Sequence, residues 1–241
     1  MRLLVDIGNS RIKWALTENS SVLSRSGVME QDLPAVQQLF TQLQRETAIT
    51  SAVVVCVGKE ELYQQLVSLI HQISGVSASR FYSTRKSAKV KNAYPDYESL
   101  GADRWAAMIA GYQLYFGPLL VCNCGTALTI DLVNANGRHQ GGYILPGLSL
   151  ARRSLHDGTA RLPLVYGGDL KPATDSVSAI SNGTLMQMVA AIEQVAVEHG
   201  QPNCVLTGGD AAFVGSFLGI PFHHEPDLVL KGLAITAAKD D

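Results

Sequence analysis

The sequence predicts an α/β fold, in which strands alternate with helices along most of the chain. Short apolar runs rich in β-branched residues alternate with longer segments whose apolar residues recur at helical spacing. A pattern of strand, polar turn and strand occurs twice, once near residue 3 and once near residue 119. With 241 residues, 46% of them hydrophobic and 17% charged, the chain has the composition of a globular protein with a large core.

The first half is expected to open with a β-hairpin. Residues 3–16 contain two apolar runs joined by Gly8-Asn9-Ser10, which is a typical hairpin turn. Apolar residues at helical spacing then predict a helix over residues 32–46 and another over about 62–73. Between these helices, the β-branched run at residues 52–57 predicts a buried strand.

The second half is expected to repeat this beginning. Residues 119–133 again contain strand, turn and strand, and residues 139–148 predict a third strand closed by Pro146-Gly147. Apolar spacing predicts a helix over about residues 182–199. Residues 203–213 are expected to form a strand, a Gly-Gly turn and the start of a helix.

The two hairpins can be compared residue by residue. Residues 5–10, VDIGNS, and residues 122–127, CNCGTA, both place a small acid or amide, one spacer, a glycine and a small polar residue between apolar runs. We interpret this as a duplicated hairpin, with each half supplying one polar turn. Backbone N–H groups beside glycine can approach phosphate oxygens closely, so the two turns are candidates for binding one shared anion.

Asp6 and Lys13 extend this hypothesis. A carboxylate repels phosphate, so Asp6 fits beside one only if a divalent cation or its water shell lies between them. Lys13 would add positive charge to the same anion. The alternative is a plain hairpin in which Asp6 accepts hydrogen bonds from the turn and Lys13 is solvated.

A third glycine turn lies in LTGGDA, residues 206–211. A helix that follows Gly-Gly can receive the sugar or phosphate of a nucleotide at its N-terminus. The alternative is an ordinary connection from strand to helix in which Asp210 is the N-cap.

The segment over residues 77–100 is irregular and polar, and a helix is expected to begin near Asp103. Asp103 is either an N-cap or a general base that takes a proton from a substrate hydroxyl during phosphate transfer. Arg104 could hold a substrate carboxylate with its planar set of donors, or it is a surface arginine. Tyr94 either lines the same pocket or packs the loop.

Composition excludes several other classes of protein. A formal net charge of −2 provides no electrostatic attraction for nucleic acid or an anionic membrane, and no apolar run is long enough to span one. The four cysteines and six histidines show neither a disulfide framework nor zinc-ligand spacing, which indicates a reduced, cytoplasmic protein. Neither a Walker-type phosphate loop nor the Gly-x-Ser-x-Gly motif of serine hydrolases is present.

Five motifs in order resemble those of the type III pantothenate kinases, also described as the Bvg accessory factor-like family. These kinases form part of the acetate kinase, sugar kinase, heat-shock protein and actin superfamily. The resemblance runs from residue 3 to about residue 233. Its motifs are DIGNSRIKW, LGADRW, NCGTALTID, GGYILPGL and LTGGDA.

The resemblance implies two actin-like (ribonuclease H-like) halves, residues 1–117 and 118–241, with a nucleotide cleft between them. It implies ATP-dependent phosphorylation of pantothenate to 4'-phosphopantothenate, the first step of coenzyme A biosynthesis, by a homodimer that uses Mg²⁺ with ATP. Asp103 would be the proton acceptor. The residues implied to bind ATP are Asp6, Ile7, Gly8, Asn9, Ser10, Arg11, Ile12, Lys13 and Thr126. Those implied to bind pantothenate are Tyr94, Gly101, Ala102, Asp103, Arg104 and Ser176.

This chain departs from the family pattern at two positions. Where relatives usually have an aspartate that holds a monovalent cation, this chain has Asn123, whose amide oxygen can bind K⁺ or NH₄⁺ but brings no charge. Where relatives commonly have a substrate-contacting threonine seven residues before a glycine, it has Ser176, with Thr174 as the alternative.

Two other functions stay open at this point. One is a kinase or phosphatase of the same superfamily that acts on another small hydroxylated acid. The other is a catalytically silent nucleotide-binding protein that regulates through a partner. The intact LGADRW motif favours the enzyme, because a silent relative has no chemical need for Asp103.

Overall fold

The computed structural model describes residues 1–18, 22–159 and 162–238, and its chain divides into two compact units. The first unit comprises Met1–Leu114 together with Asp227–Asp241, and the second comprises Tyr115–Pro226. The expected halves differ from these units at the C-terminus. The last helix, α7 (Leu228–Ala237), packs on strands β1, β2 and β4 and so belongs to the first unit.

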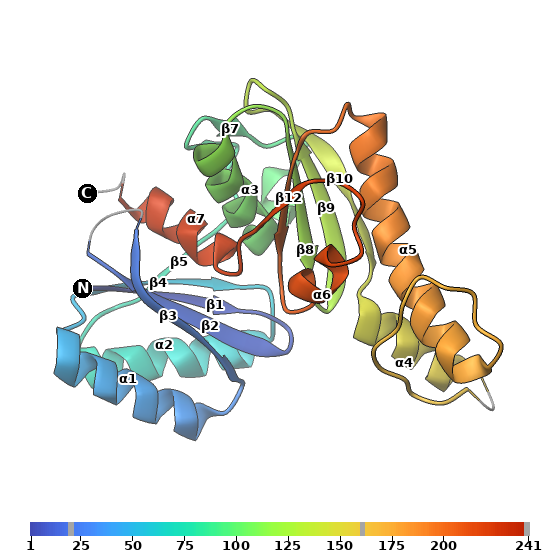
Figure 1. The fold of residues 1–241 in the computed structure, drawn as a ribbon. Coiled ribbons are helices and arrows are strands. Elements are labelled where there is room, and N and C mark those ends of the chain that lie inside the picture. The colour runs from blue at the N-terminus through green and yellow to red at the C-terminus, as the bar shows by residue number, and fades with distance from the viewer. Residues whose placement is uncertain (19–21, 160–161, 239–241) are drawn as a thin grey trace. The chain divides into compact units, whose positions relative to one another are not determined.

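The first unit contains a five-stranded sheet. Its strands are β1 (Arg2–Ile7), β2 (Arg11–Thr17), β3 (Leu23–Glu30), β4 (Ser51–Cys56) and β5 (Ser79–Arg80). They lie in the order β3-β2-β1-β4-β5, with antiparallel pairs on the β3 side of β1 and parallel pairs on its β4 side. Helices α1 (Leu33–Thr47) and α2 (Glu60–Ser74) cover one face of this sheet, and α7 lies on the other (Figure 1).

The core of the first unit follows from the alternation of side chains along β1. Leu3, Val5 and Ile7 point to the face covered by α1 and α2, where they join Phe40 and Leu66 in one buried cluster. Because successive strand residues point to opposite faces, Asp6 lies on the face that carries α7. The predicted hairpin, both helices and the strand between them are confirmed.

The segment between β5 and helix α3 (Ala102–Tyr115) has little regular structure, as predicted. It contains the short hairpin of β6 (Lys86–Ser87) and β7 (Val90–Lys91) and one turn of 3-10 helix at Tyr97–Ser99. Helix α3 is buried on all sides over most of its length. A Cβ at Gly232 of α7 would overlap the Ala106 carbonyl, so glycine lets these two helices approach each other closely.

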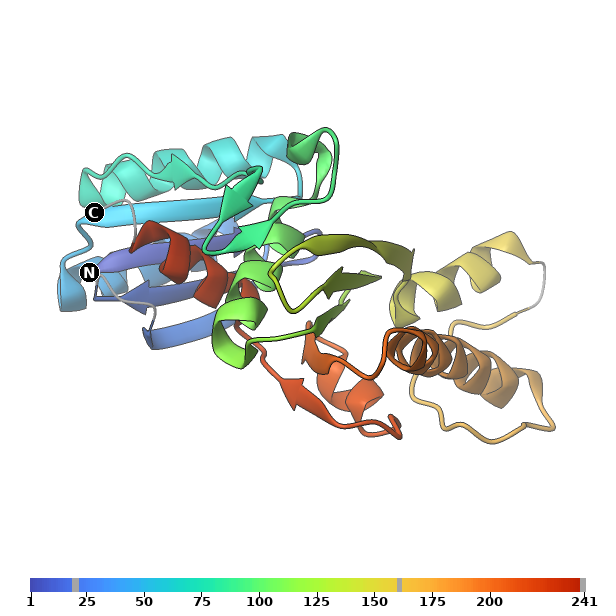
Figure 2. The same ribbon diagram turned by 90° about the horizontal axis from the view of Figure 1, so that it is seen from above.

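The second unit contains another five-stranded sheet. Its strands are β8 (Leu119–Cys124), β9 (Ala127–Val133), β10 (His139–Pro146), β11 (Asn203–Thr207) and β12 (Phe222–His224). One buried cluster joins β8, β9 and β11 to the long helix α5 (Ser176–Glu198) and the short helix α6 (Ala211–Gly215). Helix α4 (Leu148–Gly158) lies beside α5 (Figures 1 and 2).

The two sheets have the same construction. The order β10-β9-β8-β11-β12 repeats β3-β2-β1-β4-β5, with antiparallel and parallel pairs in the same places. The hairpin β8–β9 therefore occupies the position in its sheet that β1–β2 occupies in the other. This confirms the duplication inferred from the short sequence match.

The structure differs from prediction at the start of α5, which begins at Ser176 rather than near residue 182. Its first turns alternate serines with Val177, Ala179 and Ile180 and lack the apolar periodicity on which the prediction depended. The helix is instead started by Asp175, whose carboxylate accepts a hydrogen bond from the Ser178 N–H at 2.9 Å. Within the described ranges, no helix is both long and apolar enough to cross a membrane.

Candidate active site

The first glycine turn is held rigidly by its neighbours. The Gly8 N–H donates to the Arg11 carbonyl at 3.0 Å, and the Gln31 side-chain amide donates to the Gly8 carbonyl at 2.8 Å. A Cβ at Gly58, after β4, would lie only 2.6 Å from the same carbonyl oxygen. The Gly8 peptide thus uses its own N–H inside the turn.

The residues of this first turn divide by burial. Asn9, Ser10 and Arg11 are exposed, whereas Ile7 and Ile12 are fully buried in the core. Ile7 and Ile12 can therefore offer only backbone atoms to a nucleotide, although the resemblance places them among its binding residues. Their apolar side chains anchor the turn to the sheet instead.

Asp6 and Lys13 lie directly opposite each other in the register of β1 and β2. Burial, together with the nearby charge of Asp103, raises the pKa of Asp6 to about 7, and the charge of Lys13 opposes this rise. The fold therefore brings two carboxylates and one ammonium together beside the first turn. A divalent cation beside Asp6 would favour its ionised form.

Asp103 lies inside the first turn of α3, because the helix begins at Ala102. It is therefore not the N-cap that the alternative interpretation required. Its Oδ1 accepts a hydrogen bond from the Arg104 N–H at 2.8 Å, and a Cβ at Gly101 would lie 2.8 Å from the same oxygen. Glycine at position 101 leaves room for this carboxylate.

Arg104 is not the surface arginine of the alternative interpretation, since only 7% of it is exposed. Its Nη1 donates to the Tyr94 hydroxyl at 3.3 Å, and the centre of the guanidinium lies 5.9 Å from the centroid of the Tyr94 ring. The arginine on α3 and the tyrosine in the preceding segment are thus in contact with each other.

The second glycine turn resembles the first in its hydrogen bonds. The Gly125 N–H donates to the Ala127 carbonyl at 3.1 Å, and the Gly147 N–H, just before α4, donates to the Thr126 carbonyl at 3.0 Å. A Cβ at Gly147 would overlap the Gly125 carbonyl. Thr126 itself is exposed at the tip of the turn.

Asn123 occupies the position in the second sheet that Asp6 occupies in the first. It pairs with Thr129 on one side and Thr207 on the other. Its Oδ1 lies close to the backbone, because a Cβ at Gly208 would be 2.6 Å from it. Within the described part of the chain, the Asn123 side chain makes no hydrogen bond.

The third turn is followed by α6, a helix of only five residues. Asp210 stands at its N-cap position, but its side chain does not cap the helix. Its backbone N–H instead donates to the Cys124 carbonyl at 2.9 Å, which ties this turn to the end of β8.

Ser176 and Thr174 are both exposed at the start of α5. Neither hydroxyl has a hydrogen-bond partner in the ranges that the structure describes. Both therefore keep the ability to bind a substrate, and the choice between them stays open.

No group of three or more His, Cys, Asp or Glu side chains within the described ranges could hold a metal ion by itself. Mg²⁺ in kinases is commonly bound by one or two carboxylates together with the phosphates of the substrate. Asp6, with Asp103 near it, fits that pattern. All four cysteines are free thiols.

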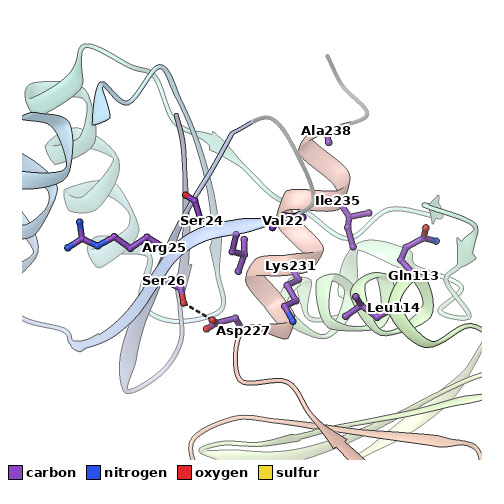
Figure 3. A pocket seen from close by; sticks show the side chains of 11 residues that line it. Val22, Ser24, Arg25, Ser26, Gln113, Leu114, Asp227, Lys231, Ile235 and Ala238 are labelled. Atoms are coloured by element: carbon purple, nitrogen blue, oxygen red, sulfur yellow. Dashed lines mark hydrogen bonds between the residues drawn. The ribbon is translucent and has the colours of Figure 1, made fainter. Parts of the chain in front are cut away.

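A separate cavity of about 800 Å³ lies in the first unit between β3, the end of α3 and α7 (Figure 3). It is lined in part by Arg25, Gln113 and Lys231, and the Ser26 hydroxyl donates to Asp227 at 2.6 Å. None of the residues expected at the active site lines this cavity.

Sequence reasoning missed Gln31 and Gly58. Each of them holds a glycine turn from a distant part of the chain. No short pattern in the sequence marks them, because their role depends on which strands become neighbours.

Comparisons with known proteins extend this description. The model of a family described as type III pantothenate kinase matches residues 2–198. A type III pantothenate kinase of Pseudomonas aeruginosa (strain LESB58) is 36% identical over 246 residues, which cover 98% of this chain and 98% of the relative. That of Aromatoleum aromaticum is 32% identical over 244 residues, which cover 100% and 99%.

Solved structures show the same fold at lower identity. A Campylobacter jejuni protein described as a conserved member of the Baf family of transcriptional activators is 20% identical, with a TM-score of 0.63 and coverage of 99% of this chain and 98% of that one. The inorganic polyphosphate/ATP-glucomannokinase of Arthrobacter sp. strain KM is 14% identical, with a TM-score of 0.51 and the same coverage. Together with the two matching sheets, this likeness confirms an α/β fold of two actin-like halves.

Proposed function

The chain belongs to the type III pantothenate kinase family, and from this premise we propose which of its residues carry out the reaction. The activity is phosphorylation of the primary hydroxyl of pantothenate by ATP, which gives ADP and 4'-phosphopantothenate. It uses a divalent cation with ATP. Neither a substrate other than pantothenate nor a silent regulatory function finds support in the relatives.

Asp103 is the proton acceptor for the pantothenate hydroxyl. This proposal rests on one observation. The charge of Asp103 raises the pKa of Asp6, so the two carboxylates lie near each other beside the first glycine turn. As the hydroxyl oxygen bonds to the γ-phosphorus, its proton passes to the Asp103 carboxylate and the bond from phosphorus to the bridging oxygen of ADP breaks. Gly101 and Ala102 belong to the same substrate-binding segment.

The first turn binds the phosphates of ATP. Asn9 and Ser10 are its exposed polar residues, Lys13 supplies positive charge, and Asp6 holds the ATP-bound Mg²⁺. The exposed side chain of Thr126, on the equivalent turn of the second unit, contacts ATP as well. Arg11 is exposed and lies 3.6 Å from Glu30, so its contribution depends on release from that weak ion pair.

Pantothenate is bound by Tyr94 and Arg104, with Ser176 or Thr174 as a further hydroxyl contact. The Arg104 guanidinium is suited to the pantothenate carboxylate because it offers a planar fork of donors. Its burial supports this role, since a buried cation binds an anion more strongly than a solvated one does.

Asn123 stands where relatives usually have the aspartate that holds a monovalent cation. Its amide oxygen, without a hydrogen bond in the described part of the chain, is able to ligate K⁺ or NH₄⁺. Because the amide brings no charge, the activity depends on this cation only weakly.

The working form is a homodimer in the cytoplasm, where the four free thiols stay reduced. Support for the dimer comes from large apolar side chains that are exposed on β10, α4, α5 and the segment between the two helices, because exposed apolar surface is typical of protein–protein interfaces. These side chains are Tyr143, Ile144, Leu150, Leu155, Leu164, Tyr166, Leu170, Val177 and Met186.

A coupled assay of ADP release tests the function. ADP should form at a high rate only when ATP, Mg²⁺ and pantothenate are all present. Equal ADP release with and without pantothenate would contradict the assignment. Rapid turnover of a different hydroxylated acid, without any of pantothenate, would point to another kinase of the same fold.

A further inference from the structure

The segment that carries Tyr94 is irregular, yet polar side chains fix it at several points. The Ser83 hydroxyl donates to the Leu100 carbonyl at 2.8 Å, near the start of α3. The Gln113 side chain donates to the Ala88 carbonyl at 2.6 Å, at the tip of the hairpin β6–β7. A further point is Asn92, which follows β7.

Asn92 is 4% exposed, and its side-chain amide uses both its donor and its acceptor atom. Its Nδ2 donates to the Thr84 carbonyl at 3.4 Å and to the Tyr97 carbonyl at 3.2 Å. Its Oδ1 accepts a hydrogen bond from the Tyr94 N–H at 2.9 Å. A buried amide with backbone partners on both sides fixes the path of the chain between them.

The backbone of Tyr94 is therefore held by Asn92, while its hydroxyl accepts a hydrogen bond from Arg104. Arg104 is itself buried on α3, a rigid helix. Small rotations of the Tyr94 backbone would move its hydroxyl by much more, because the ring extends far from the Cα atom. The bond between Asn92 and Tyr94 therefore helps to hold Tyr94 against Arg104. It does so together with the bond that the Arg85 guanidinium donates to the Pro95 carbonyl at 3.3 Å.

We propose that Asn92 is a positioning residue for pantothenate, which acts by holding Tyr94 against Arg104. This inference rests on the proposed function, in which Tyr94 and Arg104 bind pantothenate. Asn92 itself does not touch the substrate. Its effect is on substrate affinity rather than on the transfer step, because Asp103 is held separately by the first turn of α3.

A double-mutant cycle tests this coupling. Asn92→Ala should raise the KM for pantothenate by roughly tenfold, with kcat and the KM for ATP changed by less than about twofold. In a Tyr94→Ala background, Asn92→Ala should change the KM for pantothenate by less than about twofold, because the residue through which it acts is gone. Ser83→Ala, which loosens the same segment at another point, is the matched control and should have the same effect in both backgrounds.

A second variant separates positioning from general stability. Asn92→Asp keeps the acceptor for the Tyr94 N–H but loses both donors, so its Tm should fall while its KM for pantothenate stays closer to the parent than that of Asn92→Ala. If instead the KM for pantothenate rises in step with the fall in Tm in both variants, Asn92 only stabilises the segment and the proposal fails. If Asn92→Ala does not fold, Asn92→Asp is compared with the parent alone. A lowered Tm with a parental KM for pantothenate then supports the proposal, and a KM raised together with the loss of stability contradicts it.

The outcomes distinguish the inference from the function on which it rests. Suppose that Tyr94→Ala raises the KM for pantothenate, and that Asn92→Ala raises it by the same factor in the Tyr94→Ala background as in the parent. Then only the positioning role of Asn92 is wrong. If Tyr94→Ala leaves the KM for pantothenate unchanged, Tyr94 does not bind the substrate, and both the inference and this part of the proposed site are overturned.

Discussion

The charge of Asp103, at the start of α3, raises the pKa of Asp6, on β1, although the two residues are far apart in the sequence. Burial of Asp6 is the larger cause of this rise, and Lys13 opposes it. Two acids beside one lysine leave the site short of positive charge. This is the environment in which a phosphate-bound divalent cation is stabilising.

Asp103→Asn should leave the protein folded and able to bind ATP, but should lower kcat by about 10²–10⁴. Asparagine keeps the size of the side chain and its acceptor for the Arg104 N–H, yet it cannot take a proton. Steady-state kinetics and ATP binding by calorimetry are the measurements. Arg104→Ala is the comparison and should mainly raise the KM for pantothenate. Parental kcat in a well-folded Asp103→Asn would exclude a catalytic role.

Asp6 should make the stability of the ligand-free protein depend on pH. Its pKa is raised to about 7 by the fold, so its contribution is fully favourable below about pH 4 and is lost as the pH rises through 7. Asp6→Asn should therefore match the parent in Tm near pH 4 and exceed it at pH 8. The same substitution should abolish turnover, as should Asp6→Ala, because Mg²⁺ loses its ligand.

The test of this pH dependence is a series of melting curves in buffers without Mg²⁺ or nucleotide. If the parent and Asp6→Asn lose the same amount of stability between pH 4 and pH 8, a group other than Asp6 causes the pH dependence. Normal turnover in a folded Asp6→Ala variant would show that Asp6 only stabilises the turn and does not hold Mg²⁺.

Asn123 should make the enzyme less dependent on K⁺ than a relative with aspartate at this position. Activity in sodium-only buffer should be a substantial fraction of that in K⁺ or NH₄⁺, and Asn123→Asp should increase the stimulation by these ions. Complete inactivity in sodium, restored by a low concentration of K⁺, would show that the amide alone suffices.

Tyr166→Glu should shift the protein from dimer to monomer. The Tyr166 side chain is 77% exposed and belongs to the apolar set between α4 and α5, where a charge would be buried without a partner. Sedimentation velocity measures the change. Val197→Glu is the matched control, because Val197 is 60% exposed near the other end of α5 and should tolerate charge. A Tyr166→Glu protein that stays dimeric would place the interface elsewhere.

Gly58→Ala should weaken ATP binding, by roughly tenfold in the KM for ATP, since the new Cβ must displace the Gly8 carbonyl. Gly183→Ala, inside α5, meets no atom within 4 Å and should be neutral or slightly stabilising. An unchanged KM for ATP in Gly58→Ala would mean that the first turn does not need this glycine.

Much of the fold was predictable because it depends on local periodicity. The β1–β2 and β8–β9 hairpins, helices α1 and α2 and strand β4 follow from apolar spacing and from glycine turns, which neighbouring residues decide. The short match between VDIGNS and CNCGTA also predicted the repeated sheet. The start of α5 was missed because a capping aspartate, rather than an apolar pattern, begins it.

The motifs predicted candidate residues for the site, and only the tertiary structure decided how each of them is placed. Three features of the site depend on distant segments packing together. Ile7 and Ile12 turn their side chains into the core, and Arg104 is buried. Gln31 and Gly58 hold the first turn. Helix α7 belongs to the first unit for the same reason. Such contacts are set by the burial of whole faces of sheets and helices, and a local sequence pattern does not specify which distant face it will meet.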